Sequence, residues 1–330
     1  MDRKYRIVID TLGADAGPLE VLKGANMILE QHPEVVLTIV GDKATIEENM
    51  TSLDRVEIID TDVYFSNDEN IMEALAKKPN ASILLAAKAC KEKEDCIGLL
   101  TAGNSGSVLV SCVKYLLTPE MTRPCIAGIL PNEKDFYTCL VDCGANIDCT
   151  ASQLHQFARL GRDFMQNLYG LESPKIGLLS NGVESHKGNK LVKETYPILK
   201  EDKTLNFVGN IEGNRALSGD CDVLVADGFA ANQVLKVTEG TATRMIKDMV
   251  KYSQKHQQPE IMELVNYLMM TYDLSALGGG VVLGVSKPVI KSRGNSKAIT
   301  FFNTADMLIN IANNKTIFNN RDVRLANDRN

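Results

Sequence analysis

Short apolar runs alternate along the chain with longer segments in which apolar residues recur every three or four positions. Short runs of this kind are typical of buried strands, and the three-to-four spacing is typical of helices that pack on a core. Strands are therefore predicted at residues 5–10, 35–40, 97–101, 125–130, 137–142, 175–180, 207–210 and 223–226. Helices are predicted at residues 19–31, 82–93, 107–117 and 152–169.

The alternation of strands and helices determines the expected fold class. Parallel neighbouring strands need a long crossover connection, which is usually a helix. We therefore expect an α/β protein of three layers, α/β/α, around a mostly parallel sheet, with residues 1–330 forming one catalytic unit. A polar or glycine-bearing turn follows each strand, and ligands bind at the carboxyl edge of such sheets. These turns are expected to meet at one cleft.

Residues 241–273 change in character and are predicted to be mostly helical. An apolar stripe follows the break at Gln257-Gln-Pro259, and it consists of Ile261, Met262, Leu264, Val265, Leu268 and Met269. A helix pair that faces the core or a dimer partner is the first interpretation, and contact with a membrane surface is the alternative. The polar, asparagine-rich tail at 313–330 is expected to fray at its end.

Composition excludes several classes of protein. The net charge of −6 and the pI near 5.4 argue against a surface that binds polyanions, so no nucleic-acid partner is expected. The first ten residues lack the apolar region of a signal peptide, so a reducing cytosol and eight free thiols are expected. No Cys-x-x-Cys pair occurs, so no metal site is expected, and a catalytic Cys143 or Cys149 is a minor alternative to buried thiols.

The turn Thr101-Ala-Gly-Asn-Ser-Gly-Ser107 lies between a predicted strand and a predicted helix. Free backbone N–H groups and the helix dipole make such a turn a possible phosphate cradle. A turn that needs small residues only for close packing is the other interpretation, and both stay open. Similar glycine-bearing turns occur at 142–146, 184–189, 209–213 and 227–232.

The order of motifs along the chain resembles that of a known family. These motifs are Ala102-Gly-Asn-Ser-Gly106, Arg123-Pro124, Leu140-Val-Asp-Cys-Gly-Ala-Asn-Ile-Asp-Cys149, Gln156-Phe-Ala158, Lys187-Gly-Asn189, Asn206-Phe-Val-Gly-Asn-Ile-Glu-Gly213, Asp227-Gly-Phe229, Asn232 with Val234-Leu-Lys236, and Glu239-Gly240. Together they resemble the bacterial phosphate acyltransferases, the PlsX-type fatty acid and phospholipid synthesis proteins. The resemblance extends from about Ile7 to Asn295.

This resemblance implies a fold like that of isocitrate and isopropylmalate dehydrogenases and of phosphotransacetylases. It also implies a cytoplasmic homodimer without a cofactor that transfers a fatty acyl group from acyl-[acyl carrier protein] to inorganic phosphate. The acyl phosphate would feed phospholipid synthesis. Some relatives associate peripherally with the inner face of the membrane, which would give the 241–273 stripe a role.

The implied chemistry fits a chain without a convincing Ser-His-Asp set. A thioester leaves as a thiolate whose conjugate acid has a pKa near ~8.5, so it needs little help from a general acid, and phosphate is already a nucleophile at neutral pH. The protein must hold the phosphate dianion against the carbonyl carbon and stabilise the oxyanion with preorganised donors.

The resemblance places the expected site residues on the turns. Lys187 is the first choice to meet phosphate or oxyanion, and Asn232 is a second donor, with a solvated lysine and a turn-forming asparagine as the alternatives. Expected phosphate or substrate contacts come from Asn104, Ser105, Gly106, Gly144, Asn146, Asn189, Lys291 and Arg293. Supporting carboxylates, which orient cations or backbone groups, are Asp142, Glu212 and Asp227.

Four positions depart from the family pattern, namely Ala16, Val183, Ala231 and Arg293. Ala231 matters if its backbone needs positive φ or a close approach to ligand. These changes motivate an alternative function, a weakened relative that binds acyl carrier protein or acyl phosphate as a regulator. A nicotinamide-dependent decarboxylating dehydrogenase is a third hypothesis, which would need a metal-binding aspartate cluster that the sequence does not show.

Overall fold

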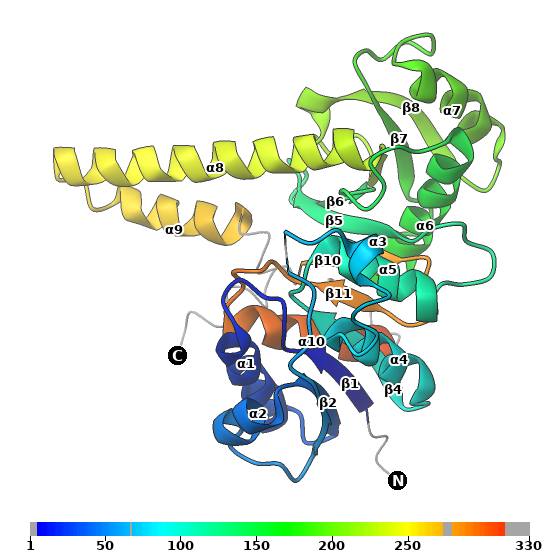
Figure 1. Cartoon of the computed structure of the whole chain (residues 1–330). Coiled ribbons are helices and arrows are strands. Elements are labelled where there is room, and N and C mark those ends of the chain that lie inside the picture. The colour runs from blue at the N-terminus through cyan, green and yellow to red at the C-terminus, as the bar shows by residue number, and fades with distance from the viewer. Residues whose placement is uncertain (1–4, 67, 273–278, 314–330) are drawn as a thin grey trace.

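A computed structural model describes residues 5–66, 68–272 and 279–313. Its centre is one sheet of eleven strands in the order β3-β2-β1-β4-β11-β10-β5-β6-β9-β7-β8 (Figure 1). The strands are β1 (Tyr5–Asp10), β2 (Val35–Gly41), β3 (Val56–Asp60), β4 (Cys96–Thr101), β5 (Cys125–Pro131), β6 (Tyr137–Val141), β7 (Lys175–Ser180), β8 (Asn206–Glu212), β9 (Val223–Val225), β10 (Gly280–Leu283) and β11 (Val289–Lys291). Seven of the ten strand pairings are parallel, which confirms the mostly parallel sheet.

Helices cover both faces of the sheet, so the predicted three layers are confirmed. The helices are α1 (Pro18–Gln31), α2 (Lys43–Asn49), α3 (Ile71–Ala74), α4 (Ser82–Glu92), α5 (Ser105–Tyr115), α6 (Ala151–Tyr169), α7 (Lys190–Glu201), α8 (Gly228–His256), α9 (Ile261–Tyr272) and α10 (Ala298–Ala312), with a 3-10 turn η1 (Gly213–Arg215). On one face, α1, α6, α7 and α10 share a large apolar cluster with the sheet. On the other face, α4 and α5 pack over the first half of the sheet and the start of α8 packs over the second half.

The strands do not all point the same way, and this corrects one expectation. Strand β5 runs antiparallel to both β10 and β6, and β9, β7 and β8 continue in the direction of β6. The carboxyl ends of β1, β4 and β11 therefore lie at one edge, whereas those of β6, β9 and β7 lie at the other. The prediction that all glycine-bearing turns gather at a single carboxyl edge is wrong, because the sheet reverses direction between the two sets.

Local sequence explains where the helix before the second half of the sheet begins and ends. Thr150 and Gln153 form a capping box at the start of α6, in which each side chain bonds the other residue's backbone N–H. Gly170 ends the helix with a φ of 68°, a left-handed conformation that glycine adopts without strain. Between these caps, Leu154 and Phe157 are buried in the core, which fixes the face that α6 presents to the sheet.

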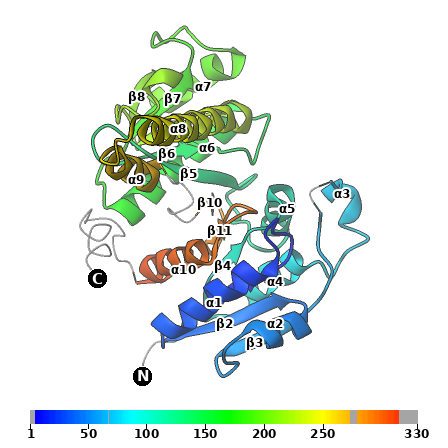
Figure 2. The same ribbon diagram turned by 90° about the vertical axis from the view of Figure 1, so that its left-hand side faces the viewer.

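Helices α8 and α9 confirm the mostly helical prediction for 241–273 as far as residue 272, the last described residue of that segment, and α8 begins earlier, at Gly228. Figure 1 shows α8 in yellow extending well beyond the sheet, with α9 packed beside its far half, and Figure 2 looks along its axis. The predicted break is confirmed at Gln257, which has a φ of 54° and precedes the turn to α9. Of the predicted tail at 313–330, only Asn313 belongs to the described residues.

None of the helices in the described part of the chain is long and apolar enough to cross a membrane.

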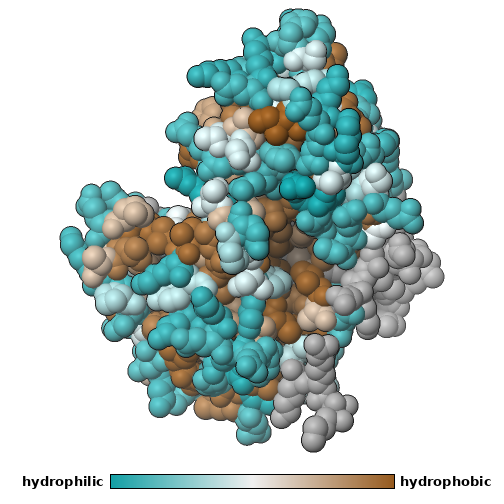
Figure 3. Space-filling model, turned by 90° about the vertical axis from the view of Figure 1, so that its right-hand side faces the viewer, coloured by the Kyte–Doolittle hydropathy of each residue, from teal (hydrophilic) through white to brown (hydrophobic). Residues whose placement is uncertain are grey.

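The face opposite the α8 arm is mostly hydrophilic (Figure 3). Apolar side chains gather there at the waist between the two halves of the molecule. On the sheet face that carries α4, α5 and the start of α8, the buried apolar residues form two clusters, one under α4 and α5 and one under the start of α8. The two halves thus share a sheet but have separate cores on this side.

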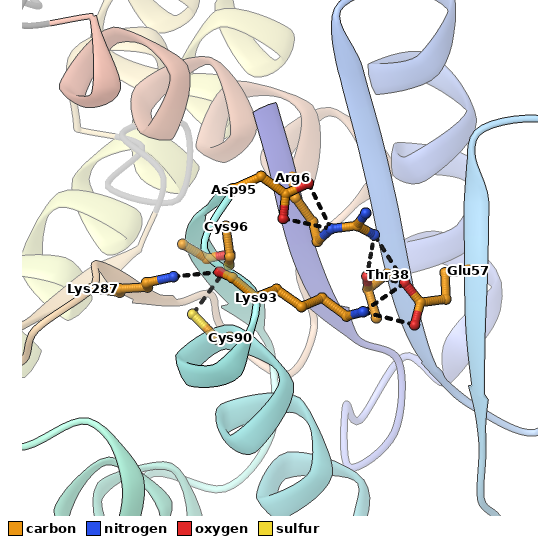
Figure 4. Close-up of polar contacts among 9 residues, drawn as sticks. Arg6, Thr38, Glu57, Cys90, Lys93, Asp95, Cys96 and Lys287 are labelled. Carbon is orange, nitrogen blue, oxygen red and sulfur yellow. Dashed lines mark hydrogen bonds and ion pairs between the residues drawn. The ribbon is translucent and has the colours of Figure 1, made fainter. Parts of the chain in front are cut away.

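Ion pairs tie the outer strands together at the amino end of β4 (Figure 4). Arg6 lies 3.0 Å from Asp95 and 3.0 Å from Glu57, and Lys93 lies 2.8 Å from Glu57. The Sγ atoms of Cys90 and Cys96 are 3.3 Å apart beside this network, although all eight cysteines are free thiols. Exposed pairs contribute about 1 kcal/mol at most, so the network mainly fixes how the α4–β4 connection sits on β1.

Candidate functional site

The turn after β4 is capped by its own asparagine. The Asn104 side chain accepts hydrogen bonds from the N–H groups of Gly106 (2.8 Å) and Ser107 (3.3 Å) at the start of α5. These are the groups that an N-cap residue normally satisfies. The packing interpretation of this turn therefore accounts for the Gly106 donor, and a phosphate could use that donor only by displacing the cap.

Asp10 lies beneath this turn and is a buried carboxyl. It accepts hydrogen bonds from Thr101 Oγ1 (2.9 Å) and Leu12 N–H (3.3 Å), and Gly103 N–H in turn donates to Thr101 Oγ1. Burial raises the pKa of Asp10 from 3.8 to about 6, and the hydrogen bonds oppose this rise. Asp10 thus joins the β1 and β4 turns but carries a proton more readily than a surface carboxyl.

Replacing Asp10 with asparagine is expected to change how stability depends on pH. Because the pKa of Asp10 is higher in the folded state, the free energy of unfolding should fall as pH rises from about 4 to above 6, by up to about 3 kcal/mol. Asp10→Asn should remove this slope. Urea denaturation at several pH values measures it, and equal slopes for the two proteins would contradict the assignment.

The turn after β11 is a cluster of cations. Burial is the main cause that lowers the pKa of Lys291, and the positive charges of Lys236 and Arg293 lower it further. The negative charge of Asp15 acts in the opposite direction. Lys291 Nζ donates to the Ser292 carbonyl (3.1 Å), and Arg293 forms an ion pair with Glu239 of α8. A partly desolvated lysine beside two other cations is an environment that an anion would stabilise.

The β1–α1 loop closes over this cationic turn. Ala16 N–H donates to the Gly294 carbonyl (2.9 Å), and a Cβ atom at Gly294 would lie 2.1 Å from Asp15 Oδ2. Any other residue at 294 would therefore require the exposed Asp15 side chain to move aside. The departure at Ala16 leaves this contact intact, because the backbone makes it.

The loop after β6 is organised by Asp142. This buried carboxylate accepts hydrogen bonds from the N–H groups of Ile126 (2.9 Å), Ala145 (3.1 Å) and Asn146 (2.6 Å), and from Asn146 Nδ2 (2.8 Å). Burial raises the pKa of Asp142, and the four hydrogen bonds oppose that shift. Asp142 and Asn146 therefore support the loop and do not face a ligand, since both side chains are buried.

The same loop meets the first turns of α8. Asp227 caps the helix by accepting from Ala230 N–H (2.8 Å), and Gly228 N–H donates to the Asn146 carbonyl (2.7 Å). Gly144 has a φ of 112°, and a Cβ atom there would lie 3.5 Å from Asn232 Cγ. Gly144 thus lies within van der Waals distance of Asn232, which is only partly buried.

Lys187 lies in the exposed loop after β7. Its N–H donates to the Glu184 carbonyl (3.0 Å), Gly188 N–H donates to Asn181 Oδ1 (2.9 Å), and Asn189 caps α7 by accepting from Val192 N–H (2.9 Å). Strands β7 and β9 pair in parallel, so this loop leaves the sheet beside the start of α8. Within the described residues, however, no hydrogen bond or ion pair joins Lys187 to Asn232 or to the 102–106 turn.

Glu212 ends β8 and precedes η1, in register with Ser180 at the end of β7. It therefore lies at the same sheet edge as the Lys187 loop. Nothing in the geometry of the described residues pairs its carboxylate with Lys187.

Helix α8 connects the two sets of turns. Asn232 lies beside Gly144 of the β6 loop. Two helical turns further along α8, Glu239 forms ion pairs with Arg293 and with Lys236 (3.2 Å). A pocket of about 400 Å³ lies along this helix. Its lining residues are Lys236, Glu239, Gly240, Thr243, Arg244, Lys247 and Arg293.

Lys236 and Glu239 were not predicted as site residues. Positions 232, 236, 239, 243 and 247 recur every three or four residues, so one face of a helix would have shown them together. That signal was missed because the helix was expected to begin only at 241. The structure thus brings Asn232, Gly144, Lys291 and Arg293 close to one helix, and leaves Lys187, Asn189 and Glu212 at the adjoining edge.

A larger hollow of about 640 Å³ lies at the ends of β2 and β3. Three carboxylates line it, from Asp42, Asp60 and Asp62. Two of them hold local structure, because Asp42 accepts from Thr45 N–H (2.8 Å) and Asp60 accepts from Lys43 N–H (3.0 Å). Carboxylates repel phosphate, so the smaller cationic pocket is the better anion site.

The cysteines near the site are not thiolates. Burial raises the pKa of Cys143 well above its usual range and that of Cys149 to about 12. Cys143 packs against Gly128, where a Cβ atom would lie 2.8 Å from its Sγ. Both thiols therefore behave as small apolar groups, and no cluster of three or more His, Cys, Asp or Glu side chains suited to a metal occurs among the described residues.

Comparison with known proteins gives consistent matches. The family model described as fatty acid synthesis protein matches residues 5–318. A phosphate acyltransferase of Streptococcus uberis is 37% identical over 308 residues, covering 91% of each chain. A phosphate acyltransferase of Streptococcus pneumoniae is 37% identical over 307 residues, covering 91% of this chain and 92% of its own.

Solved structures share the fold at low sequence identity. A phosphotransacetylase from Staphylococcus aureus has a TM-score of 0.60 at 15% identity and covers 95% of each chain. A branched-chain phosphotransacylase from Enterococcus faecalis has a TM-score of 0.58 at 16% identity, covering 93% of this chain and 98% of its own. A putative 4-hydroxythreonine-4-phosphate dehydrogenase from Salmonella typhimurium has a TM-score of 0.55 at 12% identity, with coverages of 93% and 100%. These matches confirm the expected α/β fold, which is like that of phosphotransacetylases and also like that of the putative 4-hydroxythreonine-4-phosphate dehydrogenase.

Proposed function

This chain belongs to the fatty acid synthesis protein family, and from that premise we propose that it is a phosphate acyltransferase acting on a fatty acyl thioester of acyl carrier protein. Relatives named phosphate acyltransferase, 37% identical over nine-tenths of the chain, support the reaction type. The main observation behind the proposal is the cationic turn at Lys291 and Arg293. This turn lies against Lys236 and Glu239 of α8, which follow Asn232 by four and seven residues. It offers a place for a phosphate dianion beside a neutral donor.

In the proposed reaction, a phosphate oxygen attacks the thioester carbonyl carbon. The carbon–oxygen bond to phosphate forms, the carbon–sulfur bond breaks, and the carrier leaves as a thiolate that takes a proton from solvent. The product is an acyl phosphate, a mixed anhydride. No general base is needed, because phosphate is a dianion or monoanion at neutral pH and the thiolate is a good leaving group.

The roles of the residues follow from their surroundings. Lys291, Lys236 and Arg293 attract the phosphate, and Glu239 holds the last two in place. Asn232 donates its amide N–H to phosphate or to the oxyanion, with Gly144 giving the substrate access. Lys187 reaches the reacting atoms from the neighbouring loop, because its side chain is exposed and can change conformation. Ser105 and Asn189 stay proposed contacts at the rim.

Two departures from the family pattern are compatible with activity. Ala231 is buried in the first turns of α8 and has an ordinary helical φ, so no glycine is required there. Arg293 is held by Glu239 and adds positive charge at the pocket. These observations favour the enzyme over the regulatory alternative. A homodimer, a cytoplasmic location and peripheral membrane contact remain further parts of the proposal.

The test is to incubate the protein with long-chain acyl-[acyl carrier protein] and inorganic phosphate. Free carrier thiol should appear at a rate that rises with phosphate and saturates, and hydroxylamine should trap the product as acyl hydroxamate. Thiol release at the same rate without phosphate would indicate a thioesterase. No release would reject the proposal, and tight carrier binding without turnover would support the regulator.

A further inference from the structure

Five cations follow one face of α8 from the pocket to the end of the helix. They are Lys236, Arg244, Lys247, Lys251 and Lys255. Their spacing is a multiple of three or four residues, so they lie along one side of the helix. All five side chains are exposed, and the row spans about 28 Å at 1.5 Å per residue. We name this row the basic stripe.

The basic stripe is positive although the whole chain has a net charge of −6. Helix α8 contains only two carboxylates, Glu239 and Asp248, so its net charge is +3 without its histidine. Asp248 pairs with Arg244 (2.7 Å), and Glu239 is shared between Lys236 and Arg293. Nothing among the described residues pairs with Lys247 or Lys255, so the outer half of the stripe keeps its charge.

The stripe and the pocket are continuous. Lys236, Arg244 and Lys247 line the pocket of about 400 Å³ and also belong to the stripe. A ligand attracted along the arm is therefore led to the place where the thioester would react. Charges arranged in this way raise association rates by steering an oppositely charged partner.

We propose that the basic stripe docks the acyl carrier protein through an acidic face about 28 Å long, with the acyl-bearing arm entering the pocket beside Lys236. This inference rests on the proposed function for the identity of the acyl donor. Charge complementarity supports it, since a straight row of cations on one helix matches an acidic helix laid alongside it. Of the exposed apolar residues of α8, Met245 and Tyr252 lie on a neighbouring face, whereas Val237 lies in line with Lys255 at the pocket end of the basic stripe.

Anionic lipid is the competing occupant. A headgroup layer would contact the apolar face and the stripe together and would not need the pocket. Continuity with the pocket favours the carrier protein, because only a partner that delivers a group into the pocket uses both features.

The experiment uses charge reversal outside the pocket. Lys251→Glu with Lys255→Glu should weaken binding of acyl carrier protein about 10-fold or more at low salt, mainly through a lower association rate, and the difference should shrink at high salt. Surface plasmon resonance on the full chain measures this. The matched control is Lys88→Glu with Lys91→Glu, two exposed lysines on α4, which changes net charge equally. Thermal unfolding checks that both variants fold.

Turnover of acyl-pantetheine with phosphate separates this inference from the proposed function, because that small thioester has no carrier protein to dock. Normal acyl-pantetheine turnover with reduced carrier affinity in the stripe variant only is the expected result. Unchanged carrier affinity, or an equal loss in the α4 control, would overturn the inference while the enzyme assignment stands. Loss of binding to phosphatidylglycerol vesicles with carrier affinity kept would assign the stripe to lipid and also overturn it. If no thioester is turned over but the stripe variant loses the carrier, docking stands and the proposed function fails.

Discussion

Replacing Asn232 with alanine is expected to lower kcat for phosphate-dependent thioester cleavage by about 10²- to 10³-fold, with little change in stability. This is the usual cost of removing one preorganised donor to an oxyanion, and it corresponds to about 3–4 kcal/mol. Asn232 is only partly buried and lies beside Gly144, so its loss leaves no large cavity.

Steady-state kinetics with acyl-[acyl carrier protein] and varied phosphate measure this effect. The matched control is Gln233→Ala, an exposed amide one residue further along the same helix, which should change kcat less than twofold. A similar loss in both variants would show that the start of α8 was disturbed. An Asn232→Ala protein with normal kcat would remove Asn232 from the reaction.

Lys187→Ala is the second large expected effect, a fall in kcat of about 10³-fold or roughly 4 kcal/mol. The physical reason is the loss of a mobile positive charge at the tetrahedral oxyanion. The structure makes this a sharp test, because the Lys187 side chain is exposed and none of the described contacts joins it to Asn232. In the proposed reaction its loop would therefore have to move, or its side chain extend, when substrate binds.

The control for Lys187 is Lys190→Ala, another exposed lysine three residues later at the start of α7. It should retain normal kcat and phosphate KM. If Lys187→Ala is equally active, Lys187 is a solvated surface residue and the positive charge in the reaction comes from Lys291, Lys236 and Arg293.

Strands and helices with uninterrupted patterns were predicted correctly from sequence. Strand β1 and helix α6 agree with the prediction to within one residue, because both show a clear spacing of buried apolar residues. Helix α7 was missed, since Pro197 lies inside it and proline usually ends a helix. Strands β10 and β11 were missed because four and three residues are too short to show a period.

These two short strands explain why the site was only partly predictable. Strands β10 and β11 come from late in the chain and insert between β4 and β5, where antiparallel pairing changes the direction of the sheet. No local pattern shows that insertion. The insertion brings Lys291 and Arg293 to α8. The sequence predicted that these two residues form a cationic turn, but it did not predict that Lys236 and Glu239 of α8 would lie beside them.

The turn at Asn104 shows a different reason why sequence alone was insufficient. Its sequence fits both a phosphate cradle and a capped helix start, and only coordinates distinguish them. The Asn104 side chain accepts from Gly106 N–H, so local backbone satisfaction explains the motif without a ligand. A motif of small residues before a helix is therefore a weaker sign of an anion site than a desolvated lysine among other cations.

The most direct test of the account is the position of inorganic phosphate in a crystal of the protein grown or soaked with it. Phosphate density is expected between the Asn232 amide and the cations Lys291 and Lys236, with Arg293 at its edge. Phosphate found instead on the Asn104 turn, or held by Lys187 with Asn232 and Lys291 left out of contact, would contradict it.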